Sequence, residues 1–337
     1  MNKLFIIGNG FDLSHNLKTS YSDFILWFLN KIIRIKNSQR TNIYSNPLIE
    51  INDMGYQHDD YYSLKEIRQA LKDSRIGIEA KNEFLKRLLN NYLYANWVDI
   101  EYEYYVTLLE IYRAYDAGRG LAKKRIVELN KCLDLIKDQL AEYLTTIPMI
   151  EEYNSSILDN FKSEMRYVTP EDTRLLVFNY TSTIDKYAEA MKISKDNVIY
   201  IHGKLGDIDN PLIFGYGDEI DENYRKLENL NYNEILRNMK SFSYFRASNY
   251  RTLNTFLNGS KVYDVVIMGH SCGISDRVLL NSIFTRPGCN SIKIYYHRKN
   301  ETETDYFEKT QEISRHFDDK TRMRDLILPF PQSSPLS

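Results

Sequence analysis

The strongest constraint on the fold is the apolar run LFII at residues 4–7, which the sequence GNGFD follows at residues 8–12. Four apolar residues of high β-propensity predict a short strand buried in a sheet. Gly8 and Gly10 let the backbone turn sharply and approach whatever lies above it. In doubly wound α/β sheets a phosphate or dinucleotide binds at this place, the carboxyl end of the first strand. Leu13 stands where G-x-G-x-x-G has its third glycine, so nucleotide binding and a purely structural turn both stay open.

Further apolar runs predict more strands, at residues 174–178, 197–201, 212–214, 264–268 and 291–296. The central runs are nearly continuous in β-branched residues, which is typical of strands buried on both faces of a parallel sheet. Helical stretches separate them, at residues 182–191, 222–257, 275–285 and 302–317. This alternation predicts an α/β fold of the doubly wound, Rossmann-like kind with a mostly parallel sheet.

A long helical block interrupts this pattern. Apolar residues keep a helical period through most of residues 61–146, after a polar, loop-like stretch at residues 37–60. The first strand needs the later strands as partners, so the block is inserted into one sheet domain. We therefore expect an α/β domain made of residues 1–40 and 166–337, an all-helical insertion at residues 41–165, and a smaller helical insertion at residues 220–258.

Composition excludes several classes of protein. A net charge of −2 gives no reason to expect a nucleic-acid partner through bulk electrostatics. Three cysteines without a C-x-x-C pair argue against a zinc ribbon or a disulfide framework and favour a reducing compartment. The N-terminus does not resemble a signal peptide, and no apolar run is long enough to span a membrane. We expect a cytoplasmic protein.

Polar or glycine-bearing turns follow the predicted strands. They are NYTST at residues 179–183, HG at 202–203, GYGD at 215–218 and GHSCG at 269–273. Ligands of open α/β sheets bind at the carboxyl edge of the strands, so these turns predict a pocket there. The H-E-x-x-H and P-loop motifs are absent from the sequence, so zincin and P-loop NTPase interpretations lack support.

Three side chains in these turns have both a catalytic and a structural interpretation. His202, between a buried strand and a glycine, is placed to act as a base at neutral pH, or is a core histidine bonded to backbone. Asn179 is a candidate ligand contact or a simple turn former. Asp276 is a candidate ribose contact or the cap of the following helix.

The motif GNGFDLSHNLKTSY at residues 8–21 resembles the opening motif of the AbiH family of bacterial abortive-infection proteins. The later blocks FNYTS, IHG and GHSCGISD, and NWVDIE at residues 96–101, fit the same family. More distantly, the order of motifs resembles the sirtuin-like NAD-binding fold. In that fold a Gly-Ala-Gly loop, an asparagine, a histidine before glycine and a Gly-x-Ser turn surround NAD.

This resemblance implies an anti-phage effector that hydrolyses NAD as its substrate, without a metal. His202 would be the base, and Asn179 would orient the ribose or the attacking water. The implied nucleotide contacts are Gly8, Asn9, Gly10, Asp12, Gly203, Gly269, His270, Ser271 and Asp276. One carboxylate of the sirtuin pattern falls on Thr181, for which Asp12 or Asp185 are candidate replacements. The four zinc cysteines of protein-deacylating sirtuins are missing, which counts against lysine deacylation.

Alternatives from other classes stay open. The first is a non-catalytic nucleotide-binding sensor whose helical insertion passes a signal to a partner. ADP-ribosyl transfer to a protein cannot be separated from hydrolysis by sequence. A nuclease has little support, because no acidic metal cluster and no basic patch emerge. A nucleotide ligand, a phage-derived trigger and a second copy of the chain are the partners considered, with no membrane or nucleic acid.

Overall fold

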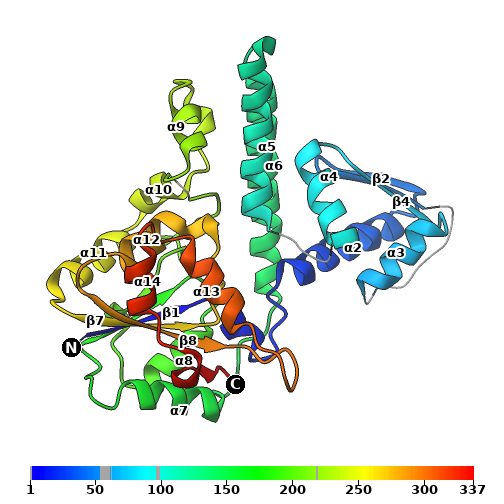
Figure 1. Cartoon of the computed structure of the whole chain (residues 1–337). Helices are drawn as coiled ribbons and strands as arrows, with labels where there is room; N and C mark the ends of the chain where they lie inside the picture. Colours follow the sequence, from blue (N-terminus) through cyan, green and yellow to red (C-terminus); the bar gives the residue numbers. More distant parts are fainter. Residues whose placement is uncertain (1, 54–60, 62, 96–98, 218) are drawn as a thin grey trace. The chain divides into compact units, whose positions relative to one another are not determined.

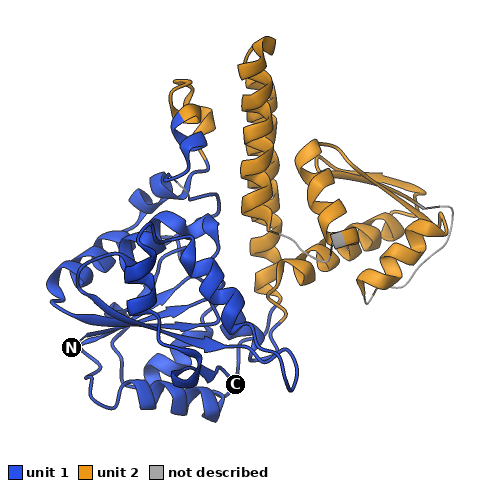
Figure 2. Cartoon of the chain, in the orientation of Figure 1, with its two compact units in different colours: residues 1–17, 147–225, 238–337 blue, residues 18–146, 226–237 orange. Residues whose placement is uncertain are grey.

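The computed structural model describes residues 2–53, 61, 63–95, 99–217 and 219–337. The chain forms two compact units, coloured separately in Figure 2. Unit 1 consists of residues 1–17, 147–225 and 238–337, and unit 2 consists of residues 18–146 and 226–237. Unit 2 therefore interrupts unit 1 twice along the chain.

Six parallel strands form the sheet of unit 1, in the order β6-β5-β1-β7-β8-β9 (Figure 1). They are β1 Asn2–Ile7, β5 Thr173–Val177, β6 Val198–Tyr200, β7 Tyr263–Met268, β8 Cys289–Tyr296 and β9 Ser334–Pro335. Numbered by chain order within this sheet, the strands run 3-2-1-4-5-6, the order of dinucleotide-binding Rossmann sheets. The prediction of an α/β fold with a mostly parallel sheet is confirmed.

Strand β1 is buried on both faces and separates two apolar clusters. Leu4 and Ile6 belong to the cluster with helices α11 Asn249–Gly259, α12 Arg277–Phe284, α13 Tyr306–Ser314 and α14 Lys320–Leu326. Phe5 and Ile7 belong to the cluster with α7 Ser155–Glu164 and α8 Thr183–Ala190. Successive residues of a strand point to opposite faces, so a strand covered on both sides requires a continuous apolar run. Burying each such side chain stabilises the fold by about 1.5–3 kcal/mol.

The other elements of unit 1 are short connections. They are α1 Asn9–Leu13, η3 Lys195–Asn197, part of α9 Glu222–Glu228, α10 Lys240–Ser243, η5 Tyr244–Arg246, η6 Ile274–Asp276 and η7 Phe330–Gln332. Residues 212–214 form no strand, so that prediction is wrong. Instead of pairing with a strand, this run is bonded to the loop after β6, since the N–H of Ile213 donates to the carbonyl of His202 (2.8 Å).

Unit 2 contains an antiparallel sheet, so the prediction of an all-helical insertion is wrong. Its strands are β2 Ile43–Ser45, β3 Ile49–Asp53 and β4 Ile76–Ala80. Ile49 and Ile51 of β3 are fully buried, as alternate residues on one face of a strand should be. The polar residues around them predict a loop and hide this short period of two.

The helices of unit 2 are α2 Tyr21–Ser38, α3 Leu64–Lys72, α4 Glu83–Asn90, α5 Ile100–Ala114 and α6 Lys123–Thr145, with π-helical turns η1 Asn91–Ala95 and η2 Tyr115–Arg119 and the 3-10 turn η4 Asn233–Ile235. Helix α2 begins with a capping box between Ser20 and Asp23. Its Phe24 and Trp27 pack against Tyr143 of α6.

The boundaries of the two units differ from those expected. Residues 18–40 belong to unit 2, because α2 packs on α6 rather than on the large sheet. Residues 147–165 belong to unit 1, because α7 covers the large sheet. The segment at residues 220–258 is divided: its residues 226–237 belong to unit 2, while α11 packs in the core of unit 1.

Candidate functional site

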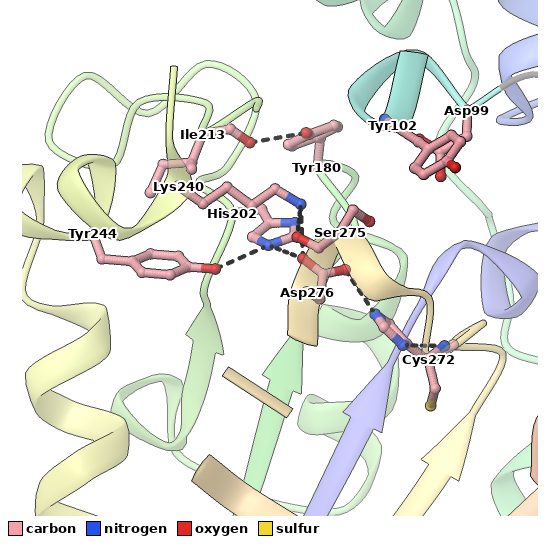
Figure 3. Close-up of polar contacts among 11 residues, drawn as sticks. Asp99, Tyr102, Tyr180, His202, Ile213, Lys240, Tyr244, Cys272, Ser275 and Asp276 are labelled. Atoms are coloured by element: carbon pink, nitrogen blue, oxygen red, sulfur yellow. Dashed lines mark hydrogen bonds and ion pairs between the residues drawn. The ribbon is translucent and has the colours of Figure 1, made fainter. Parts of the chain in front are cut away.

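The loops after β5, β1 and β7, together with the loop after β6, meet at the carboxyl edge of the sheet (Figure 3). The Thr181 hydroxyl, after β5, donates to the Asp12 carboxylate, after β1. His202, after β6, pairs with Asp276, after β7. The polar turns predicted from the sequence are thus brought together from four neighbouring strands.

Glycines let the loops after β1 and β7 pack backbone against backbone. A Cβ on Gly8 would lie 2.4 Å from the Cα of His270, and one on Gly269 would lie 2.1 Å from the N of Phe11. The N–H of Gly8 donates to Met268 O (3.1 Å) and that of Gly10 to Gly269 O (2.8 Å). The backbone N–H groups of Gly8 and Gly10, two of the implied nucleotide contacts, are therefore already bonded within the protein.

We predict that Gly269→Ala lowers the free energy of unfolding by about 3 kcal/mol or more, because a backbone clash adds to the strain of a positive φ. Gly269 has φ +74°, whereas Gly206 has φ +79° with no atom within 4 Å of the place that a Cβ would occupy. Gly206→Ala is the matched control and should cost only about 1 kcal/mol. Urea unfolding measures both variants, and equal losses would contradict the packing role of Gly269.

His202 is held by one of its two ring nitrogens. Its Nε2 lies 3.1 Å from Asp276 Oδ1 and 3.5 Å from the Tyr244 hydroxyl. An ionised carboxylate only accepts, so Nε2 carries the proton and donates to Asp276. The rings of His202 and Phe178 pack in a T-shaped arrangement, with centroids 5.0 Å apart. Within the described residues Nδ1 has no hydrogen-bond partner, which leaves it as the proton-accepting nitrogen.

Three basic side chains lie close to the carboxylate of Asp276. Lys240 Nζ lies 2.7 Å from Oδ1, beside His202, and His270 Nε2 lies 3.6 Å from Oδ2. Figure 3 shows Lys240 and His202 converging on Asp276 from different elements. We call these four side chains, Asp276, Lys240, His202 and His270, the Asp276 cluster. Every member is at least nine-tenths buried.

Burial and charge set the protonation of the Asp276 cluster. Burial, together with the nearby Lys240 charge, lowers the pKa of His202 to about 4, against the opposing effect of Asp276. Burial also lowers the pKa of His270. Although burial opposes it, the Lys240 charge holds the pKa of Asp276 well below its usual range. At neutral pH the cluster is therefore a Lys⁺–Asp⁻ pair with two neutral histidines.

A chain of hydrogen bonds fixes the orientation of His270. The N–H of Cys272 donates to His270 Nδ1 (2.9 Å), so His270 carries its proton on Nε2, toward Asp276. His316 Nε2 in turn donates to the carbonyl of Cys272 (2.8 Å). Burial lowers the pKa of His316 to about 4, so this ring is also neutral at pH 7.

We predict that the protein loses stability as the pH falls from 6.5 toward 4. The unfolded chain binds protons at His202 and His316 near pH 6.5, whereas the folded chain resists them until about pH 4. Each residue then contributes a slope of about 1.4 kcal/mol per pH unit in that window. Urea unfolding at several pH values measures this slope, and His316→Gln should reduce it. The exposed His297→Gln is the control, and a similar reduction there would contradict the prediction.

Asp12 and Asn179 form a second buried pair, each with one oxygen unused. Asp12 Oδ1 and Asn179 Oδ1 are buried without a hydrogen-bond partner among the described residues. Burial raises the pKa of Asp12, and hydrogen bonds from Thr181, Thr183 and Asn179 oppose the rise. Two buried acceptors without donors indicate a place for a ligand that donates hydrogen bonds.

The structure distinguishes the two candidates for the missing carboxylate. Asp12 accepts from Thr181, the residue that occupies the sirtuin aspartate position. Asp185 instead accepts from Tyr200 (2.6 Å) and Lys204 (2.7 Å), and its side chain is 43% exposed. Asp12 is thus the carboxylate beside Thr181 and Asn179.

The remaining predicted contacts have different surroundings. Asn9, the first residue of α1, and Ser271, in the loop after β7, are exposed. They follow β1 and β7, which are neighbouring strands of the sheet. Gly203, with φ +86°, allows close packing, since a Cβ there would lie 2.3 Å from Pro211 O. Asp218 lies outside the described residues.

The NWVDIE motif lies in unit 2. Asn96, Trp97 and Val98 are outside the described residues. Asp99 caps α5 by accepting from the N–H of Tyr102 (2.9 Å), and Glu101 is buried.

Lys240 and Tyr244 are the members of the site that sequence reasoning missed. Neither follows a strand, and the residues around them, RNMKSFSYF, carry no motif. The sequence alone does not distinguish a buried lysine from one on the surface. The only signal was the GYG turn at residues 215–217, which the structure places against residues 238–240.

The described residues contain no group of three or more His, Cys, Asp or Glu side chains that could hold a metal ion. Among the described helices, none is both long and apolar enough to cross a membrane. Cys132, Cys272 and Cys289 are buried free thiols.

The fold and the site define an α/β protein with polar side chains gathered where Rossmann sheets bind nucleotides. The chain belongs to the AbiH family, since the family model described as "Bacteriophage abortive infection AbiH" matches residues 4–298. No curated protein and no solved structure matches it significantly. The matched range includes the Asp276 cluster, Asp12 and Asn179. The predicted family is confirmed, and its description points to a role in bacteriophage abortive infection.

Proposed function

We propose that this AbiH protein is a cytoplasmic phage-defence effector that binds NAD in a sirtuin-like manner and hydrolyses its nicotinamide–ribose bond. The observation that carries the proposal is the presence of a neutral histidine and two unused buried oxygens at the same edge of the sheet. His202 offers Nδ1, and Asp12 and Asn179 offer their Oδ1 atoms. Both features lie at the carboxyl edge of a sheet with the Rossmann strand order.

Neutral His202 is suited to accept a proton from water. In the reaction the bond between ribose C1′ and the nicotinamide nitrogen breaks, and its electron pair neutralises the pyridinium ring. The oxygen of water bonds to C1′, and its proton passes to His202 Nδ1. Such general-base catalysis typically contributes about 10²–10⁴-fold in rate. The products are nicotinamide, ADP-ribose and one proton.

The Asp12 and Asn179 oxygens would hold the groups that react. A water molecule or a ribose hydroxyl donates the hydrogen bonds that these buried acceptors lack. Asn179 lies close enough to Asp12 to lower the pKa of that carboxyl group, so the two unused oxygens belong to neighbouring side chains. This supports the role of Asn179 in orienting the ribose or the attacking water, with Asp12 as its positioning partner.

For Asp276 and His270 we propose an indirect role instead of the expected direct contact with the nucleotide. The two carboxylate oxygens of Asp276 already face Lys240, His202 and His270. Asp276 therefore acts on the substrate through His202, whose Nε2 proton it accepts. The exposed residues Asn9 and Ser271 are better placed to contact a nucleotide directly.

A nucleotide-binding switch is the second candidate function. The favouring observation is the low exposure of Asp12, Asn179 and His202, which are 1%, 8% and 5% exposed. A site this closed fits a protein that binds NAD and waits for a phage-derived trigger. The same closure fits a latent hydrolase, because an enzyme that destroys NAD must be restrained in healthy cells.

Nicotinamide release tests the proposal against the switch. Purified full-length protein is given NAD in ¹⁸O-labelled water, with and without extract of phage-infected cells, and the products are separated by chromatography. Hydrolysis places ¹⁸O in ADP-ribose, whereas transfer to a protein releases nicotinamide and leaves ADP-ribose without ¹⁸O attached to that protein. Asn179→Ala should slow release at least tenfold, and the exposed Asn300→Ala should not. Binding of NAD without any nicotinamide release would favour the switch.

A further inference from the structure

Lys240 is the most deeply buried member of the Asp276 cluster. It is 1% exposed, on α10, and its Nζ lies 2.7 Å from Asp276 Oδ1 and 3.3 Å from the carbonyl of Ser275. A buried lysine is costly unless a carboxylate compensates its charge. Nearby, the same oxygen of Asp276 accepts from His202 Nε2. One carboxylate oxygen therefore links the buried cation to the proposed base.

Backbone hydrogen bonds fix the position of Lys240. The N–H of Lys240 donates to Tyr216 O (3.0 Å), and the N–H of Tyr216 donates to Asn238 O (3.1 Å). A Cβ on Gly217 would lie 2.9 Å from Ser275 O and 3.3 Å from the Cβ of Lys240. The GYG turn at residues 215–217 thus lies between α10 and residue 275. At position 217 only a glycine fits, because a Cβ would meet both neighbours. Lys240 is built into the site by two segments far apart in sequence.

We propose that Lys240 is a positioning residue that acts through Asp276: it neutralises and anchors this carboxylate, so that His202 stays uncharged with Nδ1 open to the substrate. The catalytic meaning of this role rests on the proposed function. The electrostatic role does not, because it concerns the protonation of His202 in the protein alone.

The charges around His202 show why Lys240 decides its protonation. The ring faces Asp276 from η6, Lys240 from α10, His270 from the loop after β7 and Tyr244 from η5. Of these only Lys240 and Asp276 are charged at neutral pH, and they cancel. Without Lys240 the carboxylate draws a proton onto His202 more readily than onto His270, because Nδ1 of His270 already accepts from the N–H of Cys272. The protonated ring could no longer act as a base.

Titration of the histidine Cε1–H signals by NMR tests this in full-length protein labelled at histidine. The six histidines are few enough to resolve, and the signal missing in His202→Gln identifies His202. Wild type should titrate at about pH 4. We expect Lys240→Met to raise this midpoint by at least one pH unit, a tenfold or larger increase in the affinity of His202 for a proton. The control is Lys309→Met, which removes a lysine bonded to the His270 carbonyl (2.9 Å) without touching Asp276, and it should leave the midpoint near wild type.

The same experiment in an Asp276→Asn background tests whether Lys240 acts through Asp276. There the Lys240→Met change should no longer raise the midpoint, because the charge that draws the proton is gone. This double variant also lacks both buried charges, so it reports on the coupling even if Lys240→Met alone does not fold. The inference would be overturned if the titration midpoint of His202 were unchanged in folded Lys240→Met. It would also be overturned if Lys240→Met raised this midpoint by one pH unit or more in the Asp276→Asn background. Since no NAD is present, failure of the proposed hydrolysis would leave these results standing.

Discussion

Replacing His202 by alanine should lower NAD turnover by about 10²–10⁴-fold while the protein stays folded. The imidazole is the one neutral base in the Asp276 cluster with an unengaged nitrogen among the described residues. Its removal leaves the Lys240–Asp276 pair intact, so no buried charge loses its counter-ion. The expected stability loss is that of a buried hydrogen bond and some packing, about 1–3 kcal/mol. Nicotinamide release measures the activity, and urea unfolding measures the stability.

The control for this substitution is His297→Ala, which removes an exposed histidine at the end of β8. It should retain full turnover. A folded His202→Ala protein with wild-type turnover would show that the proton goes elsewhere, and the assignment of the base would be wrong. A slow His202→Ala protein that regains activity with added imidazole would strengthen the assignment.

Asp276→Asn should be the most damaging single change to stability, at about 3–5 kcal/mol. It leaves Lys240 buried with a positive charge and without its carboxylate. Adding Lys240→Met should recover much of the loss, because the pair is then removed as a whole. Turnover should not recover, since the Nε2 proton of His202 would still lack its charged acceptor.

Asp264→Asn is the matched control for this prediction. Asp264 is 8% exposed, as Asp276 is, but its described partners are the neutral side chains of Asn290 and Ser291. Its replacement should cost about 1 kcal/mol, the usual value of a neutral hydrogen bond. Equal losses for Asp264→Asn and Asp276→Asn would show that the Lys240 charge does not matter.

The large sheet could be predicted because each of its main strands has a local sequence pattern, a continuous run of apolar residues. Runs such as LLVF before Asn179 and VVIM before Gly269 are apolar without alternation, and only a strand covered on both faces requires this. The turns that follow such strands lie at one edge, so Asn179, His202 and Gly269 could be grouped before the structure was known.

What the sequence could not show depends on contacts between distant segments. Nothing in RNMKSF marks Lys240 as buried, because its burial depends on Asp276 and on the GYG turn, both far away in the sequence. The position of Asp12 beside Thr181 likewise depends on the pairing of β1 with β5. The small sheet of unit 2 was missed because its strands are short and contain polar residues, so helical spacing nearby dominated the interpretation.

The measurement that tests the central claim most directly is the level of NAD and nicotinamide in cells during infection. Cells carrying wild-type protein or His202→Ala are sampled with and without phage, and both metabolites are quantified by mass spectrometry. The account predicts that infected wild-type cells lose NAD and gain nicotinamide, while His202→Ala cells do neither. Unchanged NAD in infected cells that the wild-type protein nevertheless protects would contradict hydrolysis and favour the nucleotide-binding switch.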